Sequence, residues 1–190
     1  MAKAPGRLYF TDEDEACRLL AEDPFALLVG FALDQQITVQ QAFAGPLRLK
    51  QRLGTLDPGA IAATDPARLE ALFREKPAIH RFPGAMATRV QDLAAAVASD
   101  YDGRAERIWT EATGTADLGR RIGALPGFGE MKVKALGSVL ARRFGVAAAE
   151  ALLPDHRMLG DVDSPQALID YQAAKRAHKA SLRAAKAAAS

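Results

Sequence analysis

The 190-residue chain has one cysteine, Cys17, and this scarcity excludes whole classes of site. A single thiol forms no disulfide within the chain, and it supports neither a zinc ribbon nor a four-cysteine iron–sulfur cluster. Cys17 falls in a helical pattern, so we expect a buried side chain rather than a reactive one. His156 and His178 are far apart and have no companion cysteine, so we predict no metal site.

Long apolar runs are also missing. Hydrophobic residues make up 49% of the chain, yet no run approaches the ~18 residues of a membrane span. Residues 1–7 lack the apolar centre of a signal peptide. We therefore expect a cytoplasmic protein with no membrane partner. Nothing in the sequence demands a partner subunit, and we predict a monomer.

Strand patterns are scarce, because alanine is abundant and no stretch alternates cleanly between apolar and polar residues. The predicted fold class is all-α. Asp23, Asp57, Asp65 and Ser164 each precede a proline, the arrangement typical of a helix start, and Thr11 with Asp14 resembles a further cap. We expect helices near residues 12–22, 24–34, 38–53, 58–63, 66–75, 84–100, 103–112, 116–122, 130–143 and 165–187.

The most informative segment is residues 125–136, which read LPGFGEMKVKAL. Gly127 and Gly129 permit a tight turn between two helices and a close backbone approach. The free amides at the start of the second helix attract an anion, and Lys132 and Lys134 add positive charge. Such a hairpin seats a DNA phosphate; the alternative is an ordinary corner between two helices.

A second signal is the run Gln35-Gln36, which stands with Thr38 at the junction of two helices. An amide that both donates and accepts hydrogen bonds suits the gap left when a base leaves the DNA stack. The alternative is a polar helix cap on the surface.

Together these motifs resemble the helix-hairpin-helix DNA glycosylase superfamily, of the endonuclease III and adenine-glycosylase type. Residues 27–38 are similar to its "LL…LLS-x-Q-x-T" segment, residues 83–103 to its "G-x-x-x-KA" helix and following link, and Leu125–Gly129 to its "LPGVG" hairpin. The resemblance covers residues 24–145, a glycosylase-like core. It implies two helical lobes with a cleft between them, residues 1–23 and 146–190 completing the second lobe.

The resemblance also implies roles for residues. Gln36, with Gln35 and Thr38 beside it, would fill the gap opposite a flipped base. The hairpin contacts to DNA would come from Leu125, Gly127, Gly129, Lys132 and Lys134. Carbonyls around Leu125 and Gly127 could hold a monovalent cation.

Members with lyase activity carry a lysine where this chain has Met131. A thioether forms no Schiff base, so the resemblance implies a monofunctional glycosylase without lyase activity. The missing cysteines exclude the family's iron–sulfur cluster, and the chain resembles its short, cluster-free members.

The carboxylate that assists base departure is less defined. The family places it shortly after the second hairpin helix, where Asp161 and Asp155 are equal candidates and Glu150 is the third. Each could instead be a surface acid or a helix cap.

For the base pocket we select His80, Arg81 and Phe82, with Met131, since aromatic faces stack a flipped base and arginine bonds its edge. Alternatively, Phe82 fills the core and His80 lies on the surface.

The last sixteen residues carry five cations and no acid. This tract either contacts nucleic acid or is a solvated, partly disordered helix. The sequence thus predicts an enzyme of base excision repair acting on double-stranded DNA, associated with the nucleoid in a bacterium. A non-catalytic DNA-damage or DNA-structure binding protein is the main alternative, and a helical scaffold the weaker one.

Overall fold

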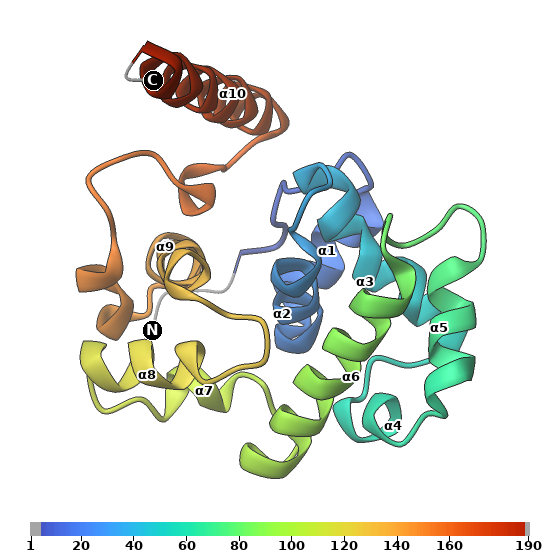
Figure 1. The fold of residues 1–190 in the computed structure, drawn as a ribbon. Coiled ribbons are helices and arrows are strands. Elements are labelled where there is room, and N and C mark those ends of the chain that lie inside the picture. The colour runs from blue at the N-terminus through green and yellow to red at the C-terminus, as the bar shows by residue number, and fades with distance from the viewer. Residues whose placement is uncertain (1–4, 189–190) are drawn as a thin grey trace.

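The computed structural model describes residues 5–188, and within this range every regular element is a helix, as predicted. Two short 3-10 helices, η1 and η2, lie in the segment that precedes the last helix (Figure 1). The elements are α1 (Asp14–Glu22), α2 (Pro24–Leu33), α3 (Val39–Leu53), α4 (Pro58–Ala62), α5 (Pro66–Arg74), α6 (Pro83–Asp100), α7 (Arg107–Thr110), α8 (Thr115–Gly123), α9 (Glu130–Phe144), η1 (Ala147–Leu152), η2 (Leu159–Asp161) and α10 (Pro165–Ala188).

Helix starts follow the predicted caps with one exception. The carboxylates of Asp23, Asp57 and Asp65 accept hydrogen bonds from backbone amides of the first turn that follows, and a proline stands at the start of each helix. Ser164 Oγ likewise accepts from the Ala167 amide at 3.2 Å. The predicted cap at Thr11 is wrong, because α1 begins at Asp14 and its N-cap, Glu13, has no side-chain cap bond.

The first lobe is built around α2, which is buried along its whole length rather than on one face. α3 packs closely against it because Gly30 has no side chain: a Cβ there would lie 2.4 Å from Phe43 Cδ1. The Phe43 ring in turn meets the edges of Phe10 and Phe31, with centroids 5.0 and 5.1 Å apart. α4 and α5 pack against α6.

Helix α1 belongs to this first lobe, and the prediction that residues 1–23 complete the second lobe is wrong for it. It packs against α2 and α3, and the buried Phe10 just before it reaches Phe43. Residues 1–4 lie outside the described part of the chain, as do residues 189–190 at the other end.

The second lobe consists of α7, α8 and α9 with the two 3-10 helices. η1 packs against α8 and α9, and η2 packs against α9. Trp109 is buried and lies beside Phe144 at a centroid distance of 6.5 Å. Gly160 lets η2 touch the α9 backbone, since a Cβ there would lie 2.2 Å from the Ser138 carbonyl oxygen.

Helix α7 is shorter than predicted. After α6, the amide of Gly103 donates back to the Val97 carbonyl, and Gly103 adopts a left-handed φ of 73°. This terminating turn occupies the residues that the sequence pattern assigned to a helix from residue 103.

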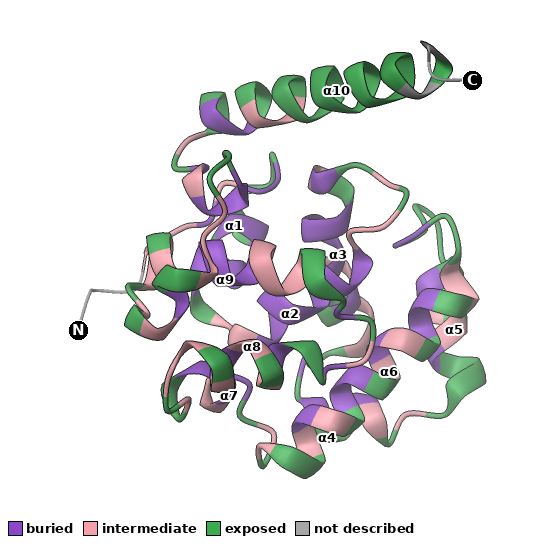
Figure 2. Ribbon diagram, turned by 60° about the vertical axis from the view of Figure 1, so that its left-hand side comes forward, coloured by how far each residue is buried: buried purple, intermediate pink, exposed green. Residues whose placement is uncertain are grey.

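The two lobes share one continuous hydrophobic core. Buried side chains of α2, α6, α8 and α9 form a single cluster, and Leu125 and Phe128 of the hairpin are part of it. Figure 2 shows this buried interior beneath α10, whose outer turns are exposed. The chain forms the predicted two-lobed all-α fold, and the cleft between the lobes opens where the hairpin faces the α2–α3 junction.

Candidate nucleic-acid interface

The hairpin forms as predicted, with α8 ending at Gly123 and α9 beginning at Glu130. Leu125 and Phe128 are buried and anchor it, and the Phe128 amide donates to the Leu125 carbonyl at 3.0 Å. Gly127 has a φ of 81°, which a glycine adopts without strain. Its missing side chain also makes room for Arg89 of α6, whose Cδ would lie 2.7 Å from a Cβ at Gly127.

The start of α9 offers free backbone donors. Gly129 is the N-cap and provides no side chain to cap the helix. Its carbonyl accepts from the amides of Lys132 and Val133, and in the described part of the chain the amides of Gly129, Glu130 and Met131 have no acceptor. Such a helix end attracts an anion through its unpaired amides and its dipole.

The Gln35-Gln36 loop lies across the cleft from this helix end. Gln36 is exposed and has a φ of 56°, a left-handed conformation that is uncommon for a residue with a side chain. Strained residues of this kind cluster at functional sites. Thr38 has a structural role, because it is the N-cap of α3 and its hydroxyl accepts from the Gln41 amide.

His80 supports the loop from beneath. Only 2% of the residue is exposed, and both ring nitrogens are engaged. The Phe82 amide donates to Nδ1 at 3.1 Å, so Nε2 carries the proton and donates to the Gln35 carbonyl at 2.9 Å. Burial lowers the pKa of His80, which favours this neutral form. His80 therefore holds the loop and presents no ring face to a base.

A hollow of about 360 Å³ connects the hairpin with the loop. Two cationic side chains, Arg89 and Lys132, lie in its wall beside the 66%-exposed Met131. The lining residues are Gln35, Arg89, Gly127, Gly129, Glu130, Met131 and Lys132. Of the predicted base-pocket residues, Met131 lines the hollow and His80, Arg81 and Phe82 do not.

Arg81 and Phe82 form a separate exposed pair at the start of α6. The Arg81 guanidinium lies 4.8 Å from the centre of the Phe82 ring, and Phe82 is 42% exposed. Phe82 therefore does not fill the core, and its face is occupied by a cation.

Lys132 points inward across the cleft. Its Nζ donates to the Ala32 carbonyl at the end of α2, at 3.3 Å. Burial and, to a lesser extent, the neighbouring Arg89 together lower the pKa of Lys132 to about 8, while Asp34 opposes the change. Lys134 points outward instead and forms an ion pair with Glu130 at 2.8 Å.

Asp34, which directly precedes Gln35 of the hollow's lining, is a carboxylate that the sequence patterns did not single out. Burial raises its pKa, and Lys175 and Lys132 oppose that rise from two other segments of the chain. In the sequence, a polar residue at a helix end looks like an ordinary cap. The electrostatic surroundings of Asp34 come from Lys132 and Lys175, which lie far from it in the chain.

The carboxylates proposed from the sequence lie elsewhere in the second lobe. Asp155 is exposed in the loop between η1 and η2. Asp161 accepts from the Met158 amide at 2.9 Å and lies 3.4 Å from Arg142 Nε, so it stabilises η2. Glu150 is exposed on η1. None of the three lines the hollow.

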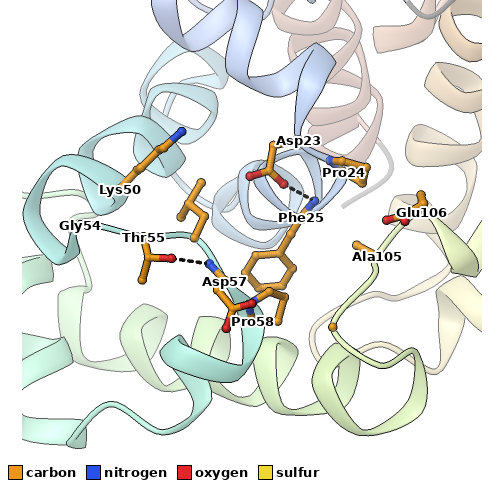
Figure 3. Close-up of a pocket in the computed structure, with 12 residues that line it drawn as sticks. Asp23, Pro24, Phe25, Lys50, Gly54, Thr55, Asp57, Pro58, Ala105 and Glu106 are labelled. Atoms are coloured by element: carbon orange, nitrogen blue, oxygen red, sulfur yellow. Dashed lines mark hydrogen bonds between the residues drawn. The ribbon is translucent and has the colours of Figure 1, made fainter.

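A second hollow, of about 350 Å³, lies between the start of α2 and the α3–α4 link (Figure 3). Two of the three acids that line it, Asp23 and Asp57, cap helices, and the Asp57 amide donates to Thr55 Oγ1 at 2.9 Å. No hairpin residue reaches it, so it is a separate structural crevice.

Within residues 5–188, no three histidine, cysteine or acidic side chains gather as a metal site would require. Across the same range, no helix is both long and apolar enough to cross a membrane.

The comparison with protein families gives one match. The model described as "HhH-GPD superfamily base excision DNA repair protein" matches residues 29–186. No curated protein and no solved structure matches the chain.

Proposed function

Because the chain belongs to the HhH-GPD superfamily of base excision DNA repair proteins, we propose that it is a DNA glycosylase that removes a damaged or mispaired base from duplex DNA. One observation carries the proposal: the hairpin and the Gln35-Gln36 loop open on the same hollow, with Arg89 and Lys132 in its wall. A cationic hollow of this volume, between a phosphate seat and an exposed glutamine, suits a nucleotide turned out of the helix.

The proposed division of labour follows the geometry. The amides of Gly129 and Met131 bind a phosphate, and Lys132 and Arg89 neutralise the neighbouring backbone. Gln36, held outward by its left-handed backbone, enters the space that the flipped base leaves. One copy of the chain supplies all of these groups, so the proposed enzyme acts as a monomer on DNA.

The catalytic carboxylate is proposed among four residues. Asp161 and Asp155 keep the place that the resemblance gives them, with Glu150 third. Asp34 joins them because it is partly buried, directly precedes Gln35 of the hollow's lining, and interacts electrostatically with Lys132. A carboxylate in such a place stabilises the positive charge that develops on the sugar as the base departs.

The proposed reaction is hydrolysis of the N-glycosidic bond without a lysine-dependent lyase step. Met131 lines the hollow and is exposed, and its thioether cannot form a Schiff base with the sugar. Lys132 Nζ is held at the Ala32 carbonyl. A monovalent cation on the hairpin carbonyls would complete the phosphate seat; replacing potassium by tetramethylammonium should then weaken DNA binding.

The test is excision from duplexes that carry uracil, oxidised, alkylated or mispaired bases, followed by alkali. Strand breaks that require alkali support the proposal. Breaks without alkali would contradict the absence of a lyase step, and trapping with borohydride in wild type and Lys132→Gln would identify the lysine. Repeating the active reaction with Asp34→Asn, Asp155→Asn and Asp161→Asn assigns the carboxylate.

A non-catalytic DNA-damage binding protein is the second candidate. The observation that favours it is that neither Asp155 nor Asp161 lines the hollow. Tight, salt-sensitive binding to damaged duplexes with no excision of any base would select this alternative.

A further inference from the structure

Helix α10 is anchored only at its first turns. Ala167 and Leu168 are buried, and the helix touches η2 there. One turn further, the side-chain amides of Gln172 and Gln40 of α3 hydrogen-bond each other. Tyr171 is partly buried against the core, and burial, with Asp34 nearby, raises its pKa to about 12. These contacts hold the N-terminal turns of α10 near the α2–α3 junction, which carries the Gln35-Gln36 loop.

Beyond Gln172 the helix has nothing to pack against in the described part of the chain. It continues to Ala188, a further length of about 24 Å at 1.5 Å per residue. The helix face that begins with Leu168 and Gln172 continues at three- and four-residue spacing through Lys175, Lys179 and Arg183. These three side chains are exposed. The same face thus changes from apolar where it is docked to cationic where it is free.

The charge on this face is uncompensated. From Tyr171 to Ala188 the sequence has five cations and no acid. Some cations elsewhere on the surface are paired, as Arg48 is with Glu13 and Lys134 with Glu130. Within residues 5–188, no carboxylate lies within ion-pair distance of Lys175, Lys179 or Arg183.

We infer that this free face of α10, defined by Lys175, Lys179 and Arg183, is a second DNA-binding surface that contacts phosphates flanking the hairpin site. A row of uncompensated cations on a projecting helix matches the phosphate backbone in charge. The row also starts at the edge of the cleft, since Lys175 acts electrostatically on Asp34. The inference rests on the proposed function, because it requires DNA in that cleft.

Two other partners, a lipid surface and a second copy of the chain, fit this face of α10 less well than DNA does. A lipid surface requires a broad apolar face, and beyond Tyr171 the apolar residues are alanines and the single Leu182. A second copy of α10 would place like charges side by side. A duplex needs only the cations.

The test compares Lys175→Gln/Lys179→Gln/Arg183→Gln with a matched control, Arg68→Gln/Lys76→Gln/Arg104→Gln. The control removes the same charge from exposed positions on α5 and on the links around α6. Binding to labelled duplexes of about 10 and about 25 base pairs is measured by anisotropy between 50 and 300 mM salt, and circular dichroism checks folding.

We expect the α10 variant to bind the long duplex more weakly than wild type. The slope of log K against log salt should fall by about 2 to 3, because each phosphate contact contributes about 0.9. The short duplex, which only spans the hairpin site, and the control variant should change little. A Lys175→Arg/Lys179→Arg variant that keeps the charge should retain the wild-type slope.

Three results would overturn the inference. The α10 variant and its control could behave alike on the long duplex while Gly129→Ala weakens binding, which leaves the proposed function standing. Wild type could prefer phosphatidylserine vesicles to the duplex. Wild type could bind no duplex of either length, and then the proposed function fails as well.

Discussion

Lys132 Nζ donates a hydrogen bond to the carbonyl oxygen of Ala32, a residue one hundred positions earlier in the chain, at 3.3 Å. The bond joins the first turn of α9 to the last turn of α2, where the carbonyl groups carry the negative end of the helix dipole. It therefore places a partly desolvated ammonium group between the hairpin and the glutamine loop, and most of the following predictions concern groups around it.

Replacing Lys132 by methionine should weaken DNA binding while the fold becomes no less stable at pH 7. The pKa of about 8 lies below the ordinary value of 10.5, so the folded state bears the cost of a desolvated charge at neutral pH. As pH rises through 8, the folded protein releases this proton before the unfolded chain does, so wild type should gain stability relative to Lys132→Met between about pH 8 and 10.5. Urea unfolding at pH 7 and 9.5 measures both differences.

The loss of the Lys132 proton should also change the affinity for DNA. If charged Lys132 contacts phosphate, wild-type affinity should fall by up to about tenfold between pH 7 and 9, as the charged fraction declines. Lys132→Met should show a flatter profile, and Lys134→Gln serves as the control. Equal pH profiles for wild type and Lys132→Met would contradict a role for this charge.

Gly129→Ala should separate folding from DNA binding. A Cβ at Gly129 meets nothing within 4 Å, and its φ of −90° suits alanine, so stability should be unchanged. A phosphate on the α9 amides would meet the added methyl group, and losing one such hydrogen bond lowers affinity about tenfold. If this variant binds duplex with wild-type affinity, the proposal that a phosphate binds at the start of α9 is wrong.

Gly127→Ala provides the contrast. Its left-handed φ of 81° and the contact with Arg89 Cδ should make this variant less stable by about 1–2 kcal/mol. Its binding loss would therefore include damage to the hairpin itself, which thermal unfolding would reveal.

Glu130→Gln should strengthen DNA binding by about threefold at 0.1 M salt. Glu130 stands at the first position of α9, beside the proposed phosphate, and it occupies Lys134 in an ion pair. Its removal takes away a like charge and releases a cation. The gain should disappear above 0.5 M salt; a gain that persists there would point to a different cause.

Gln36→Asn should lower excision about tenfold and leave the fold intact. Asparagine tolerates the left-handed backbone that Gln36 adopts, but its side chain is one methylene shorter. Binding of undamaged duplex should barely change, since the contact forms only when a base is flipped. Single-turnover excision measures the loss, and an unchanged rate would assign the gap-filling role to another residue.

Gly160→Ala should destabilise the protein by about 3 kcal/mol, because the new methyl group would overlap the backbone of Ser138. Gly119→Ala is the matched control: it lies inside α8, and its Cβ would meet Leu152 at an ordinary 3.7 Å. We expect that control to be neutral or stabilising by up to about 1 kcal/mol. Urea midpoints compare the two variants.

The fold could be predicted where its signals are local. Asp23, Asp57 and Asp65 cap helices because each precedes a proline that fixes the first helical φ. The limits of the hairpin could also be predicted from local residues, because Gly127 and Gly129 mark the turn between α8 and α9. The start of α7 could not be predicted, because Gly103 ends α6 by bonding back to Val97 rather than by opening a new helix.

The candidate site was predicted only in part, because its chemistry depends on contacts distant in sequence. The sequence favoured His80 as a base-stacking residue. In the structure its two ring nitrogens bond the Phe82 amide and the carbonyl of Gln35, a residue 45 positions away. Asp34 gains its setting from Lys132 and Lys175, which no local pattern brings together. Lys132 was expected only as a cation of the hairpin, but its long side chain reaches the hollow that Met131 also lines.

The single core shared by both lobes has a mechanical consequence. Leu125 and Phe128 of the hairpin are buried in the same cluster as side chains of α2 and α6. The two lobes therefore cannot move apart without exposing apolar surface to water. On the proposed function, a protein that does not open would require the duplex to deform so that a base reaches the hollow. The cost is lowest where stacking and pairing are already weak. Rigidity itself would then favour damaged positions, before any side chain in the hollow reads the base.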